Sequence, residues 1–266
     1  MLSKTEGAFH AWDRFSLLGV GKYRSRHYAR GGLSMSERPN IFRPIHKGIR
    51  SMLYAHARWL QVADFQDPEA SNALVLGLKK DLGDSLSDCL LCLLSVHTRH
   101  EERDILAALG RHDPGAVALV MKEHVQLAHT VREVAATCDE LLRATMPEDR
   151  LSLGDRLLTE ADALFAEYMV HLNHEEDWVV PVMWQWFADA DLDAMRGGFY
   201  NNLPLPLFET WMRWTLPALN PHELRLFVRG MAGPSPNRLG ELLRIAEATL
   251  PAGRWTALKT SVSDLT

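Results

Sequence analysis

The chain has 266 residues, of which 47% are hydrophobic and 24% are charged, and its formal net charge is -5. This composition is typical of a soluble globular protein with a sizeable core. The weak negative charge predicts no nucleic-acid partner, and the apolar stretches are too short for a membrane span or a secretory signal. Three cysteines, a small and odd number, predict a reducing, cytoplasmic location.

The first segment, residues 1–38, contains scattered glycines and basic residues without sustained apolar periodicity. We therefore expect a flexible N-terminal tail. Glu6 and Asp13 argue against a mitochondrial presequence, which is normally poor in acidic residues. Met35 offers an alternative start, in which case residues 1–34 are not translated.

Helical periodicity dominates residues 39–190. In the first segment, for example, Ile45, Ile49 and Leu53 recur at helical spacing. Proline and acidic residues interrupt the pattern near residues 113–115 and 146–149. The pattern predicts four long helices, at about 40–63, 84–109, 115–144 and 150–179, the last kinked or interrupted by Pro181. Long helices with short connections indicate an all-α fold, an antiparallel up-down four-helix bundle.

The last segment, residues 191–266, has a different composition, with prolines, glycines and several tryptophans in or near it. Helical periodicity returns near Pro221–Met231 and Leu239–Leu250. We expect a C-terminal helical extension that packs on the bundle. Its tryptophans are interpreted as a satellite core, with a homodimer contact or a gate over a metal site as alternatives.

One six-residue phrase occurs twice, first as His97-Thr98-Arg99-His100-Glu101-Glu102 and 74 positions later as His171-Leu172-Asn173-His174-Glu175-Glu176. In a helix, residues four positions apart lie on one face. Each phrase therefore offers an imidazole and a carboxylate to one point in space, which is typical of a metal site.

A lone histidine precedes each phrase, His46 on the first predicted helix and His124 on the third. Each half of the bundle would then contribute two imidazoles and one carboxylate. Such a mixture suits two cations, because a carboxylate can bridge them and reduce their repulsion. The predicted metal ligands are His46, His97, Glu101, His124, His171 and Glu175.

This ordered set, with Pro181 following the second phrase, resembles the haemerythrin-like, or HHE cation-binding, family over about residues 40–190. The resemblance implies a four-helix bundle that holds two iron ions bridged by the glutamates. It also implies a small ligand, such as dioxygen, peroxide or nitric oxide. Oxygen carriers of the family have another histidine where this chain has Ala128, and His129 is rotated by about 140° from His124. The pattern therefore matches the branch with fewer histidine ligands.

Four further side chains are candidates for a supporting role around the metal ligands. Tyr168 lies one turn before His171, so its phenol is a candidate for a role at the metal. The alternative interpretation is a core tyrosine whose hydroxyl is hydrogen-bonded. Glu167 lies on the same stripe, where a buried acid needs a partner. His100 and His174 lie one turn from predicted ligands, and packing or exposure is their alternative. We expect Glu102 and Glu176 on a solvated face or in ion pairs, with orientation of a ligand histidine as the alternative.

Three classes of function are compatible with these residues. The first is a di-iron protein that acts as a redox enzyme or a sensor of a small ligand. The second is a helical bundle with one zinc or other divalent ion, acting as a hydrolase or transferase, which would leave the repeat unexplained. The third is a metal-free structural or interaction bundle, which would bury six polar groups at a high energetic cost.

Overall fold

The described part of the chain is helical, as predicted: residues 38–79 and 89–265 of the computed structural model contain helices and no β-strand. These residues belong to one unit, Arg38–Thr266. Residues 1–37 of the predicted tail and residues 84–88 of the predicted second helix lie outside the described residues. None of the described helices is both long and apolar enough to span a membrane.

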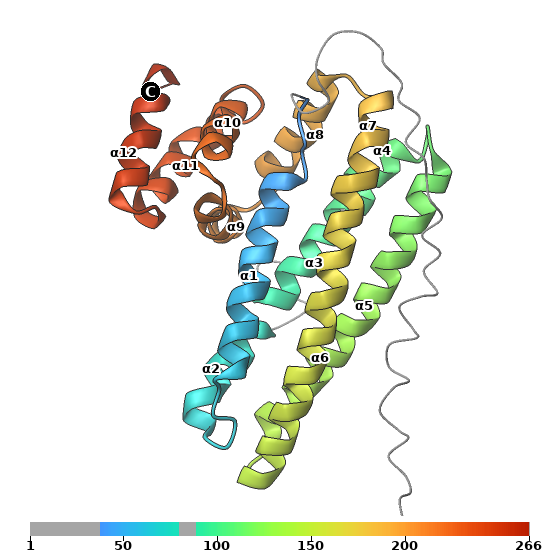
Figure 1. The fold of residues 1–266 in the computed structure, drawn as a ribbon, viewed down its shortest axis with the longest axis vertical. Helices are drawn as coiled ribbons and strands as arrows, with labels where there is room; N and C mark the ends of the chain where they lie inside the picture. The colour runs from blue at the N-terminus through green and yellow to red at the C-terminus, as the bar shows by residue number, and fades with distance from the viewer. Residues whose placement is uncertain (1–37, 80–88, 266) are drawn as a thin grey trace, which may run out of the picture. The chain divides into compact units, whose positions relative to one another are not determined.

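Four helical runs contain the predicted metal ligands, and they lie alongside one another in Figure 1. Contacts join α1 to α6, α5 to α6, and α3 to α5. The short helices α4 (Ala107–Leu109) and α7 (Val180–Trp186) extend the second and fourth runs. The four main helices are α1 (Arg43–Gln61), α3 (Leu90–His100), α5 (Pro114–Arg143) and α6 (Pro147–His174).

Proline and side-chain caps mark where the helices begin. Asp113 caps α5 by accepting a hydrogen bond from the backbone N–H of Ala116, at 2.9 Å, and Pro114 follows as the first helical residue. The same Asp-Pro pair at Asp67 and Pro68 begins α2 (Pro68–Leu78), a helix that the periodicity did not predict. The sequence therefore carried a start signal for α2 in its capping pair.

Both long runs that contain a repeated phrase change from α-helix to a π-helical turn at the glutamate predicted to bind metal. These turns are η2 (Glu101–Leu106) and η3 (Glu175–Val179). Such single wide turns inside α-helices occur frequently at functional sites. The fourth run does not stop at Pro181, which lies in α7 shortly after the π-helical turn, so the run continues to Trp186.

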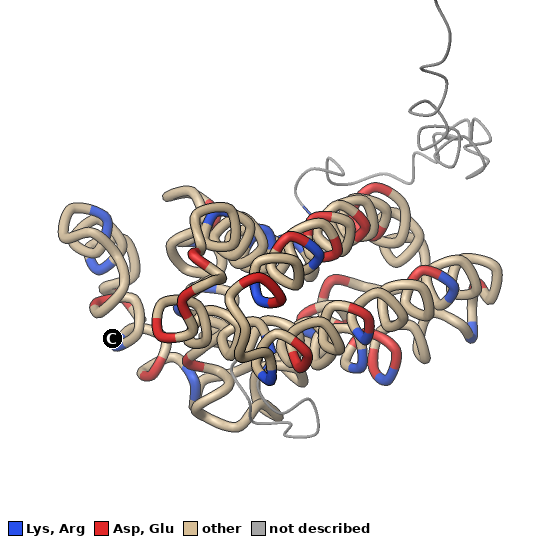
Figure 2. Tube along the Cα trace, turned by 90° about the horizontal axis from the view of Figure 1, so that it is seen from below, with Lys and Arg blue, Asp and Glu red and all other residues tan. Residues whose placement is uncertain are grey.

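Helices α8 to α12 follow the ligand-bearing runs. Helix α9 packs against α1 and α11, and Glu223 of α10 pairs with Lys47 and Arg43 of α1 at 2.5 and 3.2 Å. Figure 2 shows basic and acidic positions interspersed along the described helices. The bounds are α8 (Asp189–Asn202), α9 (Leu205–Ala218), α10 (Pro221–Ala232), α11 (Pro236–Thr249) and α12 (Ala252–Ser261), followed by a 3-10 turn (Ser263–Leu265).

The apolar core of the described residues consists of two clusters, and the predicted ligands lie near the boundary between them on each run. On the third run, for example, Val120 belongs to one cluster and Leu127 to the other, with His124 between them. On the fourth run Leu172 and Val179 flank Glu175 in the same way. The candidate ligands therefore form a polar layer enclosed by apolar side chains.

A buried arginine connects the loop between α5 and α6 with α2 and with the residues just before α2. Arg150 is 1% exposed, and its guanidinium has only uncharged hydrogen-bond acceptors among the described residues. Removing it would leave several buried acceptors without a donor, which is the costly side of a buried hydrogen bond. Its acceptors are the carbonyls of Phe65, Leu141 and Ala144 and the side chains of Ser71 and Asn72, at 2.8 to 3.1 Å.

We expect Arg150→Met to lower the free energy of unfolding by about 3 kcal/mol or more, because the lost bonds are buried. Urea denaturation of the metal-free protein would measure this. Arg156→Met is the control, since Arg156 lies on the same helix, is 43% exposed and pairs with Glu140. We expect its effect to stay below about 1 kcal/mol. Equal losses in the two variants would contradict the role assigned to Arg150.

Candidate metal centre

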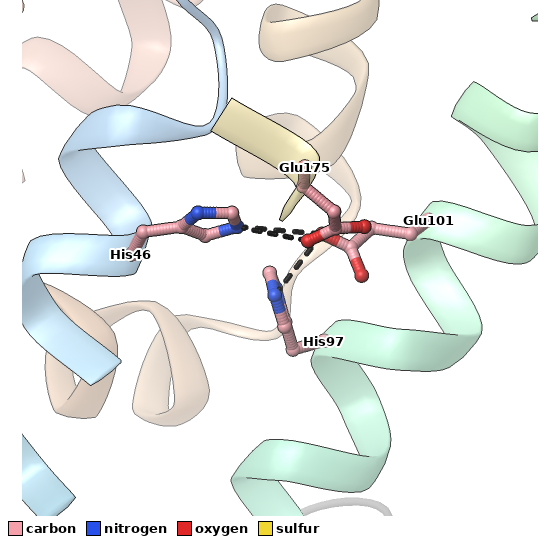
Figure 3. Close-up of side chains that lie close together, drawn as sticks. All are labelled: His46, His97, Glu101 and Glu175. Atoms are coloured by element: carbon pink, nitrogen blue, oxygen red, sulfur yellow. Dashed lines mark ion pairs between the residues drawn. The ribbon is translucent and has the colours of Figure 1, made fainter. Parts of the chain in front are cut away.

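The six predicted ligands come together in one buried cluster. His46 lies on α1, His124 on α5, and the paired residues of each phrase lie where α3 meets η2 and α6 meets η3. All six residues are at most 2% exposed. Figure 3 shows His46 and His97 pointing toward the carboxylates of Glu101 and Glu175.

The two carboxylates lie between two pairs of histidines. On one side, Nε2 of His97 is 3.0 Å from Oε1 of Glu101, and Nε2 of His46 is 3.4 Å from Oε2 of Glu175. On the other side, Nε2 of His171 is 3.4 Å from Oε2 of Glu175, and Nε2 of His124 is 3.7 Å from Oε2 of Glu101. The donor atoms form two groups, each within 4.8 Å, and both carboxylates belong to both groups.

Every donor atom of this layer lacks a hydrogen-bond partner. The Nε2 atoms of the four histidines and both oxygens of Glu101 and Glu175 are buried and make no hydrogen bond with any of the described residues. Buried polar atoms are normally paired, so eight orphaned atoms in one place need an explanation. Nitrogen and oxygen atoms that bind one ion at about 2.1 Å and at right angles lie about 3 Å apart. The spacing of these atoms therefore fits metal ligands.

Burial changes the protonation of the cluster when no metal is bound. It lowers the pKa of His46 to about 4 and that of His124 to about 3, and lowers the pKa of His97 well below its usual value. Burial raises the pKa of both Glu101 and Glu175, and the nearby charge of Glu175 raises that of Glu101 further. These three imidazoles are therefore neutral and ready to coordinate, whereas for His171 burial is outweighed by the charges of Glu175 and Glu123, which raise its pKa. A cation would supply the positive charge that ionised carboxylates need here.

Carboxylates orient three of the four histidines from the outside. Nδ1 of His46 is 3.2 Å from Glu176, Nδ1 of His124 is 3.1 Å from Glu102, and Nδ1 of His171 is 2.9 Å from Glu123. A proton on Nδ1 that is donated outward leaves the Nε2 lone pair facing the centre. Carboxylate support of this kind is typical of metal-bound histidines.

The second glutamate of each phrase was expected on a solvated face or in an ion pair, and Glu176 indeed forms an ion pair with Arg50 at 2.6 Å. Glu102 is 35% exposed and Glu176 only 12%, and each supports a histidine on another helix. Adjacent residues in a helix are rotated by about 100°, so the glutamate next to each ligand reaches the neighbouring helix. Burial alone would raise the pKa of Glu176, but hydrogen bonds from His46 and Arg50 lower it to about 2.

Comparison with known proteins assigns no family to the chain. No family model, curated protein or solved structure matches it. The resemblance to haemerythrin-like proteins therefore remains a prediction from the ordered histidines and glutamates. The geometry of the donor atoms carries the functional conclusion below.

The four supporting candidates have separate places in the structure. The hydroxyl of Tyr168 donates to the carbonyl of Leu94 at 3.2 Å and also hydrogen-bonds with Thr98. Glu167 accepts a hydrogen bond from Thr130 on α5 at 2.8 Å, which provides the partner that a half-buried acid needs. Both side chains therefore make contacts within or between the packed helices.

The two remaining histidines of the phrases differ from each other. His174 donates to Oε1 of Glu123 at 2.7 Å, so it shares that carboxylate with the ligand candidate His171. His100 instead packs on the ring of Phe199, with centroids 4.1 Å apart, and its Nε2 lies 3.2 Å from Asp104. Neither residue belongs to the two donor groups.

Glu123 is a supporting residue that sequence reasoning missed. It lies beside His124 in the chain but supports His171 and His174 on another helix. No spacing rule pairs residues on two helices, and the packing of α5 on α6 decides this contact. The adjacent Glu-His pair was the only local signal.

We expect Glu123→Gln to weaken metal binding by about 10- to 100-fold, as for other carboxylates that support a ligand histidine. The amide keeps the shape of the side chain but removes the negative charge that polarises the imidazole. Competition with a chelator of known affinity would measure the change. Glu133→Gln is the control, because Glu133 is also on α5, is 56% exposed and pairs only with His129 among the described groups. Equal affinities in the two variants would exclude a supporting role.

Proposed function

We propose that the chain is a haemerythrin-like di-iron protein whose centre binds or reacts with a small molecule such as dioxygen, peroxide or nitric oxide. The observation that carries this proposal is the set of eight buried donor atoms without hydrogen bonds. They divide into two groups that share both carboxylates. A site for a single ion would need only one group of four donors, and its carboxylates would not have to belong to a second group.

The proposal includes a four-helix bundle as the frame of the centre. Helices α1, α3, α5 and α6 each provide one histidine, and the runs of α3 and α6 also provide the glutamates. This distribution supports a bundle interior as the place of the site. The apolar clusters on both sides of the layer support exclusion of bulk water from it.

Iron fits the chemistry of the donors. Imidazole nitrogen and carboxylate oxygen suit iron as well as zinc, and a bridging carboxylate reduces the repulsion between two cations. Two irons bound here would supply redox chemistry toward dioxygen or peroxide. The chain itself would hold the imidazoles through Glu102, Glu123 and Glu176, and would keep protons off Nε2 by donating outward from Nδ1.

Metal analysis of the full chain, produced in iron-supplied medium, tests the proposal. We expect about two irons per chain and a near-ultraviolet absorption that changes when azide, peroxide or nitric oxide is added. One zinc and no iron would contradict the di-iron proposal and favour a mononuclear hydrolase or transferase. A folded protein without any metal would favour a structural bundle. Turnover of hydrogen peroxide would distinguish an enzyme from a sensor.

A further inference from the structure

A small cavity borders one side of the candidate metal centre. Its volume is about 20 Å³, and its lining includes His97 of one donor group and Glu101, which belongs to both groups. His124 and His171 are not among its lining residues. A volume of this size holds about one water-sized molecule. The cavity is therefore suited to a very small guest beside one pair of histidines.

The outer wall of this cavity comes from α8, which follows the four ligand-bearing runs in the chain. Met195 and Phe199 line it, one helical turn apart, together with Ile45 and Ile105 of the ligand-bearing runs. Most of the lining is apolar, and Arg196 of α8 also belongs to it. The Nε atom of Arg196 is buried and makes no hydrogen bond, so one N–H donor remains for an oxygen atom.

Close contacts hold α8 in place. Gly197 packs so tightly on Pro234 that an added Cβ would lie 2.6 Å from the proline Cβ. The guanidinium of Arg196 donates to Asp193 at 2.6 Å and to the carbonyl of Gly230 on α10 at 2.9 Å. A wall fixed in this way can select guests by size, because it cannot widen without breaking these contacts.

We propose that the cavity is a ligand chamber of the metal centre and that Met195 and Phe199 limit its guests to the size of dioxygen or hydrogen peroxide. The N–H of Arg196 favours a guest with a hydrogen-bond-accepting oxygen. The chemical role of the guest rests on the proposed di-iron function, whereas the size limit depends only on this chain. We expect organic hydroperoxides to be excluded, because their carbon groups need more room than a cavity of about 20 Å³ offers.

The test uses the full iron-loaded chain and the variant Phe199→Ala. We expect the wild type to respond to hydrogen peroxide and azide but not to tert-butyl hydroperoxide. Phe199→Ala should raise the rate of the spectral response to tert-butyl hydroperoxide by about tenfold or more. This factor is typical of the discrimination between small and large guests by an apolar pocket. Its iron content should equal that of the wild type. Met195→Ala opens the same wall if Phe199→Ala does not fold.

Phe227→Ala is the matched control, since Phe227 is a buried phenylalanine of α10 that does not line the cavity. It should leave the response to tert-butyl hydroperoxide unchanged. An equal gain in both variants, or a wild type that accepts the bulky peroxide as readily as hydrogen peroxide, would overturn the size limit.

A second readout needs no metal. Apolar cavities take up xenon, so crystals of metal-free Phe199→Ala under xenon pressure should show the gas beside His97 and Ile105. If the chain binds no iron, the proposed function fails, but xenon at this position still supports the chamber. Xenon absent from this position would overturn the chamber whatever the metal content.

Discussion

Glu101→Gln is expected to remove both metal ions from the protein. The carboxylate faces both donor groups, with Oε1 3.0 Å from Nε2 of His97 and Oε2 3.7 Å from Nε2 of His124. An amide offers one oxygen and places an N–H donor where the second ligand atom belongs. Elemental analysis should show the iron content falling from about two per chain to well below one.

The stability of the same variant separates a metal ligand from a structural ion pair. Without metal, Glu101 is a buried acid beside a second acid, and its pKa is raised by burial and by Glu175. Glu101→Gln should therefore leave the unfolding free energy of the metal-free protein unchanged or increase it. It should abolish the added stability that metal binding provides. A large loss in the metal-free protein would instead show that the pairing of Glu101 with histidine is structural.

Glu167→Gln is the control for this experiment. Glu167 is a half-buried acid on α6 that bonds to Thr130 and belongs to neither donor group. It should keep its iron. If it loses iron as Glu101→Gln does, the loss reflects general damage to the packed helices rather than removal of a ligand.

His97→Ala and His100→Ala are expected to give opposite results, although the two residues lie one turn apart. Nε2 of His97 belongs to a donor group, whereas Nε2 of His100 lies 3.2 Å from Asp104 and outside both groups. His97→Ala should reduce iron to about one per chain or less, because the donor group of His97 would keep only one nitrogen ligand, from His46. His100→Ala should retain about two irons.

Metal content and melting temperature, measured with and without chelator, check this pair. His100→Ala should keep a melting temperature that falls when metal is removed, as in the wild type. If His100→Ala empties the centre and His97→Ala does not, the ligand assignment within the phrase is wrong. His174→Ala makes the same comparison for the second phrase, where a partial loss of affinity is expected because His174 shares Glu123 with His171.

The helices were largely predictable because their signals are local. Apolar periodicity and proline located the main runs, and the starts at Pro114 and Pro147 lie within a few residues of the predicted ones. Helix α2 is signalled by its Asp67-Pro68 start, and apolar periodicity alone does not predict it. The π-helical turns had no recognised sequence signal, because a wide turn depends on what the flanking helix segments pack against.

The candidate ligands were predictable for a similar reason. Within each phrase, the spacing of four residues alone places an imidazole and a carboxylate on one face. His46 and His124 were added by their matching positions before the phrases, and the structure places all six side chains together. The supporting role of Glu123 and the buried bonds of Arg150 connect residues that no spacing rule relates.

The sequence by itself determined that the chain is helical and that each phrase presents its histidine and glutamate together, because contacts within one helix follow from backbone geometry. Only the tertiary structure decided which carboxylate supports which histidine, and that α8 walls a cavity beside His97. Those contacts join different helices, and their partners depend on the depth and rotation at which side chains interlock. The doubled phrase thus specifies four of the six candidate ligands, and helix packing specifies the surroundings of the candidate centre.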